Sequence, residues 1–552
     1  MRSFKSNSRL LLIIILTLSS VLRLLWLGKF PPSPYSDEVN QAYNAFAILK
    51  TGKDEHRTAF PVSFRSFGDW KPPLQTYLMI PSIAILGLNE VSLRIPSAIL
   101  GILSVILSYF LVRELFYKNR YKEKLALLTS LLMAISPWHL HQSRSAMLVA
   151  VALFFFLLAI YWFLISLKRN NYLYLSITAF VFCIYAYYGM RLIVPLFLIV
   201  LFLKYYKKLL SIKKTFCLSL GLGLILLLPL LTGFLNESNI IFGRAKTVSI
   251  FFDKGIRLKS AELQQQDMAN GIHDNISLLF HNQPYLYGLD ILKRFLTHFD
   301  GRFLFLTGDT APPFRIPNMG VLYFGELVFI PLGLLFLLKN KEKSAQLIIV
   351  WLIISVIPAA FSFLTPSHNR AFNAVFPLTL LSAYGMLNLF IRFKKRIILL
   401  SIIFSTIYML SFNYYLVNYY KVLPLDYGLD WLYGFREIFS YLNEHEKDFS
   451  KIIFLPKTGK AYTYQLFYNK FPPEKLSIEV KRSYTQDEFG FEHVSSIGKY
   501  YYFRNNRSWE ELEHQMEKGE IYIGREGEIP KEKSKHEIFY PDGKAAFRIT
   551  YL

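Results

Sequence analysis

The sequence has few cysteines, few charged residues for its length and no internal repeat. Only Cys183 and Cys217 occur among 552 residues, both inside apolar runs, so no disulfide framework is expected. Charged residues make up 18% of the chain and hydrophobic residues 53%, a composition far more apolar than that of a soluble protein. Several runs approach the roughly 20 apolar residues that cross a bilayer. The fold class that this composition predicts is an all-α polytopic membrane protein.

Positive charge is concentrated between the apolar runs. The formal net charge is +23, but the Lys and Arg residues cluster in short loops as topology determinants do, so we expect no nucleic acid partner. With the N-terminus inside, 22 of them lie in inside loops and 3 in short outside loops. We expect eleven membrane spans, at about residues 10–27, 92–112, 124–140, 146–167, 172–188, 190–203, 215–234, 321–338, 345–363, 372–391 and 397–412.

A twelfth apolar segment, at residues 74–88, is expected to lie flat in the outer interface. If it crossed the membrane, every later loop would change sides and the charge bias would oppose the positive-inside rule. Pro81 lies in the middle of the segment, which fits an interfacial helix better than a span. No small-residue cleavage site follows the first apolar run, so we expect that run to remain as an uncleaved helix.

Three larger regions then face outward: the loops 28–91 and 235–320, and the C-terminal segment. That segment is richer in charged residues and has strand-like pieces at 451–455 and 546–551. We therefore expect a transmembrane domain at 1–412 and a small extracytoplasmic α/β domain at 413–552. The expected location is the inner membrane of a bacterial cell.

The first outer loop carries an acidic pair, Asp37 and Glu38, directly after three prolines. The prolines end the first helix, and residues 39–50 have apolar side chains at helical spacing, so Asp37 lies near a helix N-terminus. One interpretation is a capping role for Asp37 and favourable first-turn charge for Glu38. Lys71 is expected at headgroup depth, as an anchor or as a phosphate ligand.

Short outer loops carry arginine and histidine at their tips. Arginine there has no topogenic purpose, and its planar fork suits a phosphate, with contact to lipid headgroups as the alternative. Three such arginines on the face that carries the acidic pair favour an anionic substrate. The candidate phosphate ligands are Lys71, Arg144, Arg191 and Arg370; candidate substrate contacts are Asp69, His139, His141, Tyr187 and His368. In loop 235–320, His273, Asp274, His298, Asp300 and Asp309 are weaker candidates for acceptor contacts, and residues 262–266 are typical of a surface helix.

An ordered set of motifs within residues 10–200 resembles the GT-C superfold of membrane glycosyltransferases. Its closest resemblance is to the branch with protein O-mannosyltransferases and lipid A aminoarabinose transferases. The set is Asp37-Glu38 before a helix, Thr51-Gly52, Gly68-Asp69-Trp70-Lys71-Pro72-Pro73-Leu74, Gly87, Arg94-Ile95-Pro96-Ser97, Ser136-Pro137 and Ser143-Arg144.

The resemblance implies a polyprenyl-phosphate-linked sugar donor and an extracytoplasmic active site. Asp37 matches the acidic residue proposed as catalytic base in that family, and Lys71 matches a lysine that binds the donor phosphate. One position departs from the pattern. Aminoarabinose transferases have an acidic residue directly before the lysine, where this chain has Trp70, so a metal site built on that acid is not expected here.

The residues and the resemblance together predict a hexosyl- or pentosyltransferase. Asp37 would act as general base, with Glu38 beside it, while Lys71 and Arg144 would stabilise the leaving lipid phosphate. Expected partners are the lipid-linked donor, a lipid, glycan or protein acceptor, and membrane lipids. No motif requires a cofactor or forms a metal site, and a role for a divalent metal stays open. The alternatives are a transporter or flippase, a ligase for lipid-linked glycans, and a non-catalytic scaffold; spans nearly free of charge disfavour a transporter.

Overall fold

The computed structural model describes residues 2–485, 492–503 and 508–552, and its contacts divide the chain into two compact units. Unit 1 comprises Met1–Leu22, Gly101–Gln142 and Val149–Tyr415; unit 2 comprises Arg23–Leu100, Ser143–Leu148 and Leu416–Leu552. The predicted domain boundary at residue 412 lies close to Leu416. Unit 2 also contains the first outer loop and a short piece around Arg144. The motifs near the acidic pair therefore share one unit with the C-terminal region.

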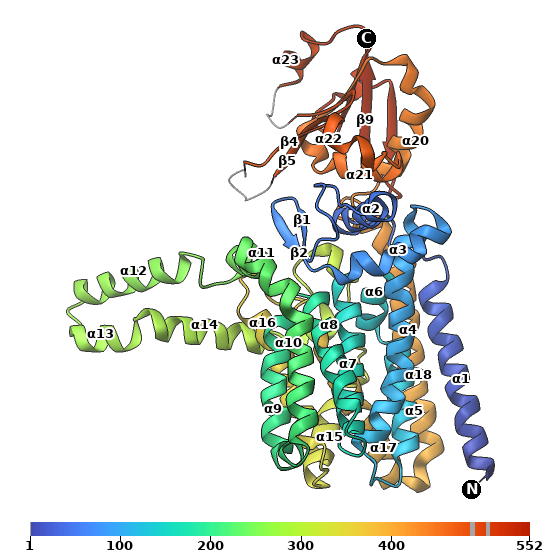
Figure 1. Cartoon of the computed structure of the whole chain (residues 1–552), viewed down its shortest axis with the longest axis vertical. Helices are drawn as coiled ribbons and strands as arrows, with labels where there is room; N and C mark the ends of the chain where they lie inside the picture. Colours follow the sequence, from blue (N-terminus) through green and yellow to red (C-terminus); the bar gives the residue numbers. More distant parts are fainter. Residues whose placement is uncertain (1, 486–491, 504–507) are drawn as a thin grey trace. The chain divides into compact units, whose positions relative to one another are not determined.

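Unit 1 is helical, and each of the eleven predicted spans overlaps one α-helix, or two α-helices for the span at 124–140 (Figure 1). Five of these helices begin or end in unit 2. The helices that carry the spans are α1 (Arg2–Leu24), α4 (Glu90–Leu115), α5 (Lys122–Ile135) with α6 (Pro137–Arg144), α7 (Leu148–Ser166), α8 (Tyr172–Ala186), α9 (Met190–Ser211), α10 (Lys213–Asn236), α15 (Glu326–Lys339), α16 (Ala345–Ala360), α17 (Val375–Arg392) and α18 (Ile397–Val417).

Several of these helices have the length and composition of membrane spans. Within the described residues, six are long and apolar enough to cross a bilayer, and three shorter apolar helices accompany them. The six are Asn7–Leu24, Glu90–Leu115, Leu148–Ser166, Lys213–Asn236, Phe372–Arg392 and Lys394–Asp426. The chain is thus an integral membrane protein with several apolar helices, and the count of eleven spans stays a prediction.

Two glycines bring α15 and α17 into close contact. A Cβ atom on Gly333 would lie 1.9 Å from the Leu381 carbonyl oxygen, and one on Gly385 would lie 2.1 Å from that of Phe329. Only glycine fits at either position, because any side chain would collide with the backbone of the facing helix. Apolar helices in lipid gain little from the hydrophobic effect, so such backbone contact is what holds them together.

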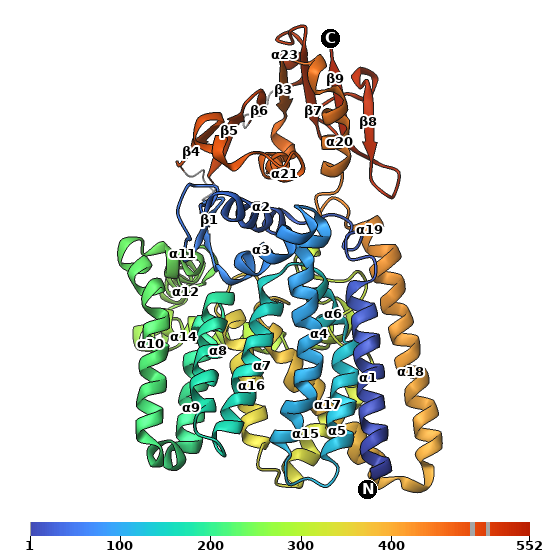
Figure 2. The same cartoon turned by 45° about the vertical axis from the view of Figure 1, so that its right-hand side comes forward.

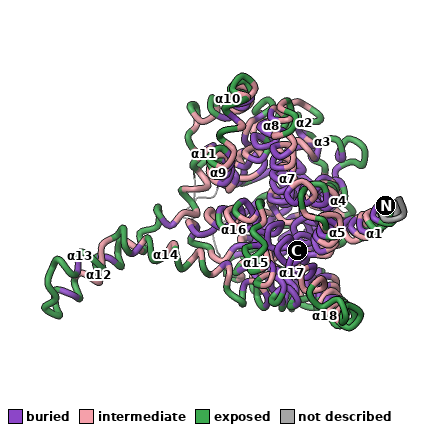
Figure 3. Tube along the Cα trace, turned by 90° about the horizontal axis from the view of Figure 1, so that it is seen from below, coloured by how far each residue is buried: buried purple, intermediate pink, exposed green. Residues whose placement is uncertain are grey.

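The region 235–320 contains a helical arm that the sequence did not predict. Between α10 and α15 lie α11 (Asn239–Val248), α12 (Gly255–Ala269), α13 (Asp274–Phe280) and α14 (Gln283–Thr297). The predicted surface helix at 262–266 is confirmed as part of α12. Helices α12 to α14 project from the remainder of unit 1, and most of their residues are exposed (Figure 3).

Unit 2 begins with the first outer loop, which folds into two helices and a hairpin (Figure 2). The helices are α2 (Ser36–Thr51), which confirms the helix predicted at 39–50, and α3 (Leu74–Leu86), which coincides with the predicted interfacial segment. The hairpin pairs β1 (Phe64–Ser66) with β2 (Asp69–Lys71). Its two-residue turn, Phe67 and Gly68, has positive φ at both positions, as tight β-hairpins require.

The C-terminal part of unit 2 is a mixed sheet with short helices, as the α/β prediction requires. Its seven strands run in the order β4-β5-β6-β3-β7-β9-β8, and β3 is parallel to both of its neighbours. The strands predicted at 451–455 and 546–551 are confirmed as β3 and β9. The strands are β3 (Lys451–Phe454), β4 (Val480–Ser483), β5 (His493–Ile497), β6 (Tyr500–Tyr502), β7 (Glu520–Gly524), β8 (His536–Phe539) and β9 (Ala545–Tyr551). The helices are α19 (Leu423–Asp426), α20 (Phe435–His445), α21 (Ala461–Tyr468), α22 (Leu476–Glu479) and α23 (Trp509–Glu513).

Helix α2 is packed between the first outer loop and the C-terminal sheet region. Its apolar residues, such as Val39 and Tyr43, share one core with residues of α21 and the sheet. The Tyr43 hydroxyl donates to the Phe471 carbonyl (2.8 Å), and the Tyr464 hydroxyl donates to the Pro34 carbonyl (2.8 Å). The C-terminal region therefore fixes the helix on which the acidic pair stands.

Candidate functional site

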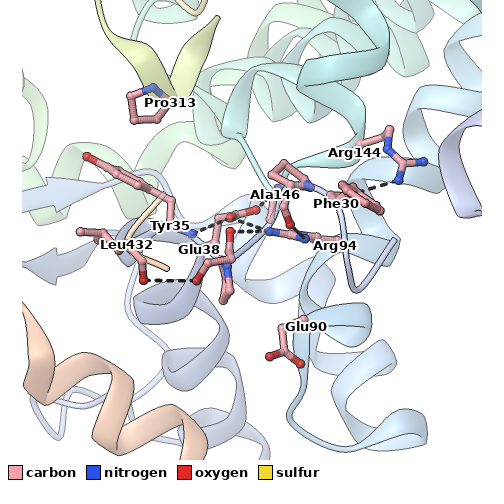
Figure 4. Close-up of polar contacts among 12 residues, drawn as sticks. Phe30, Tyr35, Glu38, Glu90, Arg94, Arg144, Ala146, Pro313 and Leu432 are labelled. Carbon is pink, nitrogen blue, oxygen red and sulfur yellow. Dashed lines mark hydrogen bonds and ion pairs between the residues drawn. The ribbon is translucent and has the colours of Figure 1, made fainter. Parts of the chain in front are cut away.

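The first turn of α2 carries Asp37 and Glu38, and the two carboxylates have different surroundings. Glu38 is completely buried and accepts hydrogen bonds from the backbone N–H groups of Tyr35 (2.8 Å) and Ala146 (2.6 Å) (Figure 4). A helix N-terminus favours negative charge, and the bond to Tyr35 closes the first turn as a capping residue does. Glu38 thus joins the start of α2 to the segment around Ala146 and is inaccessible to a substrate.

Arg94 is the charged neighbour of Glu38. Its guanidinium lies 3.5 Å from the Glu38 carboxylate, and both side chains are fully buried. Arg94 also donates to the backbone carbonyls of Leu27 (3.1 Å), Pro31 (2.9 Å) and Ser33 (2.8 Å). Prolines interrupt this segment, so its carbonyls have no helical partners and need a donor from elsewhere. Arg94 and Glu38 therefore fix the backbone that leads into α2.

Asp37 faces Lys71, which ends strand β2. The Lys71 ammonium lies 2.5 Å from an Asp37 carboxylate oxygen; the lysine side chain is 7% exposed and the aspartate side chain is 41% exposed. The Asp37 carboxylate is therefore accessible to solvent, whereas the Lys71 side chain is buried in the protein. The pair unites a buried cation with an accessible carboxylate at one helix N-terminus. Asp69, at the start of β2, accepts a hydrogen bond from the Trp70 N–H (2.8 Å).

Arg144 is buried in unit 2 and contacts backbone carbonyls. Its guanidinium donates to the carbonyls of Leu25 (2.9 Å) and Phe30 (3.3 Å) and to the Tyr419 hydroxyl (3.2 Å). The guanidinium carbon also lies 5.4 Å from the Tyr419 ring centroid and 5.5 Å from that of Tyr420. This geometry favours a positioning role for Arg144, and its assignment as a phosphate ligand stays a prediction.

The remaining candidates belong to unit 1, where His368 is the centre of a buried network. His368 Nε2 accepts from the Asp309 N–H (3.0 Å), and the Asp309 carboxylate accepts from the His368 N–H (2.5 Å). His298 Nε2 accepts from the Ser367 N–H (3.1 Å). Burial lowers the pKa of His368 to about 3 and that of His298 to about 4, and burial raises the pKa of the Asp309 carboxyl. Both imidazoles are thus neutral at physiological pH.

Four further candidates lie in the same unit, close to this network or to the start of α11. Arg370 donates to the Leu364 carbonyl (3.0 Å), and Arg191 donates to the Ile240 carbonyl (2.8 Å). His141 Nε2 lies 3.2 Å from the Pro313 carbonyl, and the His139 ring stacks on that of Phe372 (6.0 Å between centroids). These side chains are already engaged by the protein, which favours structural roles for them.

Tyr187 is the last of the candidates in unit 1. Its ring makes an edge contact with the ring of the adjacent Tyr188, with 6.2 Å between the centroids. Tyr187 and the acidic pair belong to different units.

A second buried ion pair in unit 2 has no signal in the sequence. The Arg482 guanidinium lies 2.7 Å from a Glu55 carboxylate oxygen, and Glu55 also accepts from the amides of Asn40 (2.5 Å) and Asn44 (3.0 Å). Burial raises the pKa of Glu55, but Arg482 and the other donors outweigh burial and hold it below its ordinary value. The partners are 427 positions apart, so only the tertiary fold reveals the pair.

No side-chain cluster in the described part of the chain has the makeup of a metal site, since none brings together three His, Cys, Asp or Glu that could hold an ion. The role of a divalent metal therefore stays open.

Comparison with known proteins supports the predicted resemblance in sequence. The family described as dolichyl-phosphate-mannose-protein mannosyltransferase matches residues 70–232. A putative mannosyltransferase of Bacillus subtilis (strain 168), YkcB, is 28% identical over 184 residues, which cover 33% of this chain and 24% of the relative. The chain thus aligns with about a quarter of this relative.

Solved structures extend the likeness to the fold of nearly the whole chain. The oligosaccharyltransferase of Archaeoglobus fulgidus, in a complex with Zn and sulfate, has a TM-score of 0.52 at 14% identity over 98% of this chain and 73% of that one. The oligosaccharyltransferase AglB of Archaeoglobus fulgidus, in complex with an inhibitory peptide and a dolichol-phosphate, has a TM-score of 0.51 at 14% identity, over 85% of this chain and 64% of that one. Identities this low establish the fold alone. The predicted resemblance to GT-C membrane glycosyltransferases is confirmed, in fold for most of the chain and in sequence for residues 70–232.

Proposed function

We propose that this chain is a glycosyltransferase that moves a sugar from a polyprenyl-phosphate donor to a lipid, glycan or protein acceptor on the outer face of the membrane. The observation that carries this proposal is the Asp37–Lys71 pair, an exposed carboxylate beside a buried ammonium at a helix N-terminus. The similarity in sequence to a mannosyltransferase family and in fold to an oligosaccharyltransferase in complex with a dolichol-phosphate supports it.

Each member of the pair has one task in the proposed reaction. Asp37 accepts the proton of an acceptor hydroxyl or amine as that atom forms its bond to the sugar C1. The C1–O bond to the phosphate breaks, and the polyprenyl phosphate leaves with the electron pair. Lys71 stabilises the charge that grows on the leaving phosphate, and it does so best because it is desolvated. One positioned carboxylate with no covalent intermediate gives inversion at C1.

The buried residues around the pair hold it in place without contacting substrate. Glu38 and Arg94 fix the backbone before α2, and Arg144 fixes residues 25–30. A donor phosphate would compete with Asp37 for Lys71, and this exchange would free the carboxylate to act as base when donor is bound. Loss of one charge at position 37 or 71 should therefore affect turnover far more than folding.

The test is a transfer assay with purified protein in vesicles and a synthetic polyprenyl-phosphate sugar. Asp37→Asn should abolish sugar release from the donor, and Lys71→Gln should raise the KM for the donor. Full release by Asp37→Asn would overturn the base assignment. A wild-type protein that moves the intact lipid-linked sugar between leaflets, with no release, would favour the flippase instead. Release only from preassembled oligosaccharide donors would favour a ligase.

A further inference from the structure

The loop before α21 brings a second lysine of the C-terminal region to the ring of Phe67, which Lys71 also approaches. The Lys460 ammonium lies 4.0 Å from the centroid of the Phe67 ring, and the Lys71 ammonium lies 5.3 Å from the same centroid. The two ammonium groups cannot be farther apart than these two distances added together. Like charges within about 10 Å, the Debye length at 0.1 M salt, repel each other, and the shared ring offsets part of that repulsion.

Phe67 is held in an uncommon conformation at the hairpin tip. Its φ is +55°, its side chain is 6% exposed, and the edge of the Tyr462 ring packs on it at 5.9 Å. A residue with a Cβ atom at positive φ is strained, and such strain persists where the surrounding structure enforces it. The same tip is fixed by the C-terminal region, since the Glu492 N–H donates to the Phe67 carbonyl (3.3 Å).

An ion pair also joins the hairpin to the C-terminal region. The Arg65 guanidinium makes bidentate contacts with the Glu492 carboxylate, at 2.5 Å and 3.0 Å. Arg65 pairs with Trp70 across the hairpin, and Lys71 follows directly. The C-terminal region therefore positions the strand that carries Lys71 and adds a cation next to it.

We infer that Lys460 and Lys71 together form a two-cation site for the anionic group of the lipid-linked donor, so that the C-terminal region completes the site. This inference rests on the proposed function, because that function supplies the anion. Lys71 already faces Asp37, so a phosphate would have to join or replace that carboxylate, and a second ammonium nearby would offset the negative charge that the phosphate adds. Lys460 thus binds the donor, and the hairpin aligns the two ammonium groups.

Binding of undecaprenyl phosphate to the full-length protein in detergent tests the inference, with uncharged undecaprenol as the matched probe. Lys460→Gln should weaken binding of the phosphate about tenfold, as for the loss of one charged contact, and leave undecaprenol unaffected. Lys460→Arg should retain binding, which separates lost charge from lost folding. Lys457→Gln, an exposed lysine in the same loop, is the control and should match wild type.

The outcomes distinguish this inference from the proposed function. If Lys71→Gln weakens phosphate binding and Lys460→Gln does not, the two-cation site is wrong and the donor role of Lys71 stands. If neither variant weakens it, both assignments fail. If Lys460→Gln weakens phosphate and undecaprenol equally, its effect is structural and the inference is overturned.

A separate observation concerns the helical arm of unit 1. On α14 the residues Tyr285, Leu289, Leu292 and Leu296 recur at helical spacing, and all four are exposed. The neighbouring α13 exposes Ile276, Leu278, Leu279 and Phe280, and α12 exposes Leu258 and Met268. Figure 3 shows this arm with exposed stretches interrupted by partly buried ones. A soluble surface rarely leaves such a stripe uncovered.

The base of the arm joins the ends of two apolar helices. Only two residues separate the end of α10 at Asn236 from the start of α11, and the Arg294 guanidinium of α14 donates to the carbonyls of Ser362 (3.1 Å) and Phe363 (2.8 Å), just after α16. Helix α10 is apolar and long enough to cross a bilayer, and α16 is a shorter apolar helix. We therefore expect the ends of both helices, and with them the base of the arm, to lie near headgroup depth.

We propose that α12 to α14 lie in the lipid interface, with the α14 stripe buried in the outer leaflet. Tyrosine at the start of the stripe and Lys293 beside it suit the headgroup region. This geometry would enlarge the protein's contact with the membrane next to the α10 and α16 ends.

Nitroxide labels on single cysteines in nanodiscs test the arm, in a Cys217→Ser background because Cys183 is buried. A label at Leu292 should be shielded from a water-soluble relaxing agent and accessible to oxygen, while a label at the exposed Lys259 should show the reverse. Water accessibility at both positions would overturn the proposal. Shielding at Leu292 that appears only with two copies in each disc would overturn it in favour of a second protein copy.

Discussion

Lys71 reaches Asp37 from beneath the protein surface, and the distance between ammonium and carboxylate is 2.5 Å. The cation is almost completely desolvated, whereas the anion remains two-fifths exposed. A fully buried pair would be static, and a fully exposed pair would be screened by solvent. In the proposed reaction, this intermediate arrangement would let an incoming anion replace the carboxylate at the lysine without moving the lysine.

Asp37→Asn should lower the rate of sugar transfer at least about a hundredfold, the usual effect of removing a general base. The thermal midpoint should change little, because the carboxylate is partly exposed. Transfer from a lipid-linked sugar in vesicles measures the first quantity and a fluorescence melt measures the second. Glu474→Gln, an exposed carboxyl in the same unit, serves as the control. A loss of transfer that tracks a loss of folded protein would contradict the base role.

Glu38→Ala should destabilise the protein strongly. It removes one partner of a fully buried ion pair and leaves Arg94 without its carboxylate, a change that costs about 3–5 kcal/mol. Two backbone N–H groups also lose their acceptor. Thermal unfolding in detergent should show the drop, and the double variant with Arg94→Met should recover part of it. An unchanged melting temperature would contradict the structural role of Glu38.

Exchanging the charges of the Arg65–Glu492 pair tests whether the C-terminal region positions the β1–β2 hairpin. Arg65→Glu and Glu492→Arg should each raise the KM for the donor, because each places like charges together beside the strand of Lys71. The double variant should regain much of the wild-type value. Steady-state transfer kinetics measure all three. Independent, additive losses in the double variant would show that the pair has no part in positioning Lys71.

Stability should fall on the acid side because of His298 in unit 1. Its pKa is about 4 in the folded protein against 6.5 when unfolded, so the unfolded state binds more protons between these values and stability rises with pH there. One such histidine contributes about 1.4 kcal/mol per pH unit in that window. His298→Gln should flatten the dependence of the melting temperature on pH from about 4.5 to about 6.5, because this interval lies between the folded and the unfolded pKa of His298. The exposed His514→Gln should leave the slope unchanged, and an equal effect of both would refute the assignment.

The proposed outer face can be tested by cysteine labelling in intact cells. A membrane-impermeant thiol reagent should label cysteine at the exposed positions Lys53 and Lys470, and it should reach Lys343 only after the membrane is opened. The reason is the charge bias of the loops, which assigns the acidic pair to the outside. Labelling of Lys343 from outside, or protection of Lys53, would reverse the orientation.

The helices of the fold could be predicted because an apolar run of sufficient length has few other structures available in lipid. The α2 helix and two strands of the C-terminal sheet were also predictable from local spacing. Of the arm at 239–297, only the surface helix at 262–266 was predicted, since the apolar runs in the other helices are too short to indicate a span. The structure of such short segments depends on the surface that they pack against, and local sequence patterns do not identify that surface.

The residue types and their position in the first outer loop were enough to single out Asp37 and Lys71 as candidate site residues. Asp37 and Lys71 could be paired only through the resemblance to a known family, since 34 positions separate them. Arg144 illustrates the limit. An outward arginine suits a phosphate, but the turn at residues 25–30 leaves carbonyls without partners, and these carbonyls bind its guanidinium. The need for a donor arises from backbone geometry that side-chain identities do not reveal.

The docking of α2 on α21 has a consequence for biosynthesis. Tyr43 finds its acceptor at Phe471, which the ribosome adds 428 positions later, and Pro34 receives its donor from Tyr464 after a similar delay. Helix α2 is synthesised early, so it lacks its contacts with the C-terminal region while the apolar helices that follow it are inserted. The proposed site is therefore completed only after the last apolar helix has been synthesised, and a chain arrested at that helix would lack the partners that hold α2 in place.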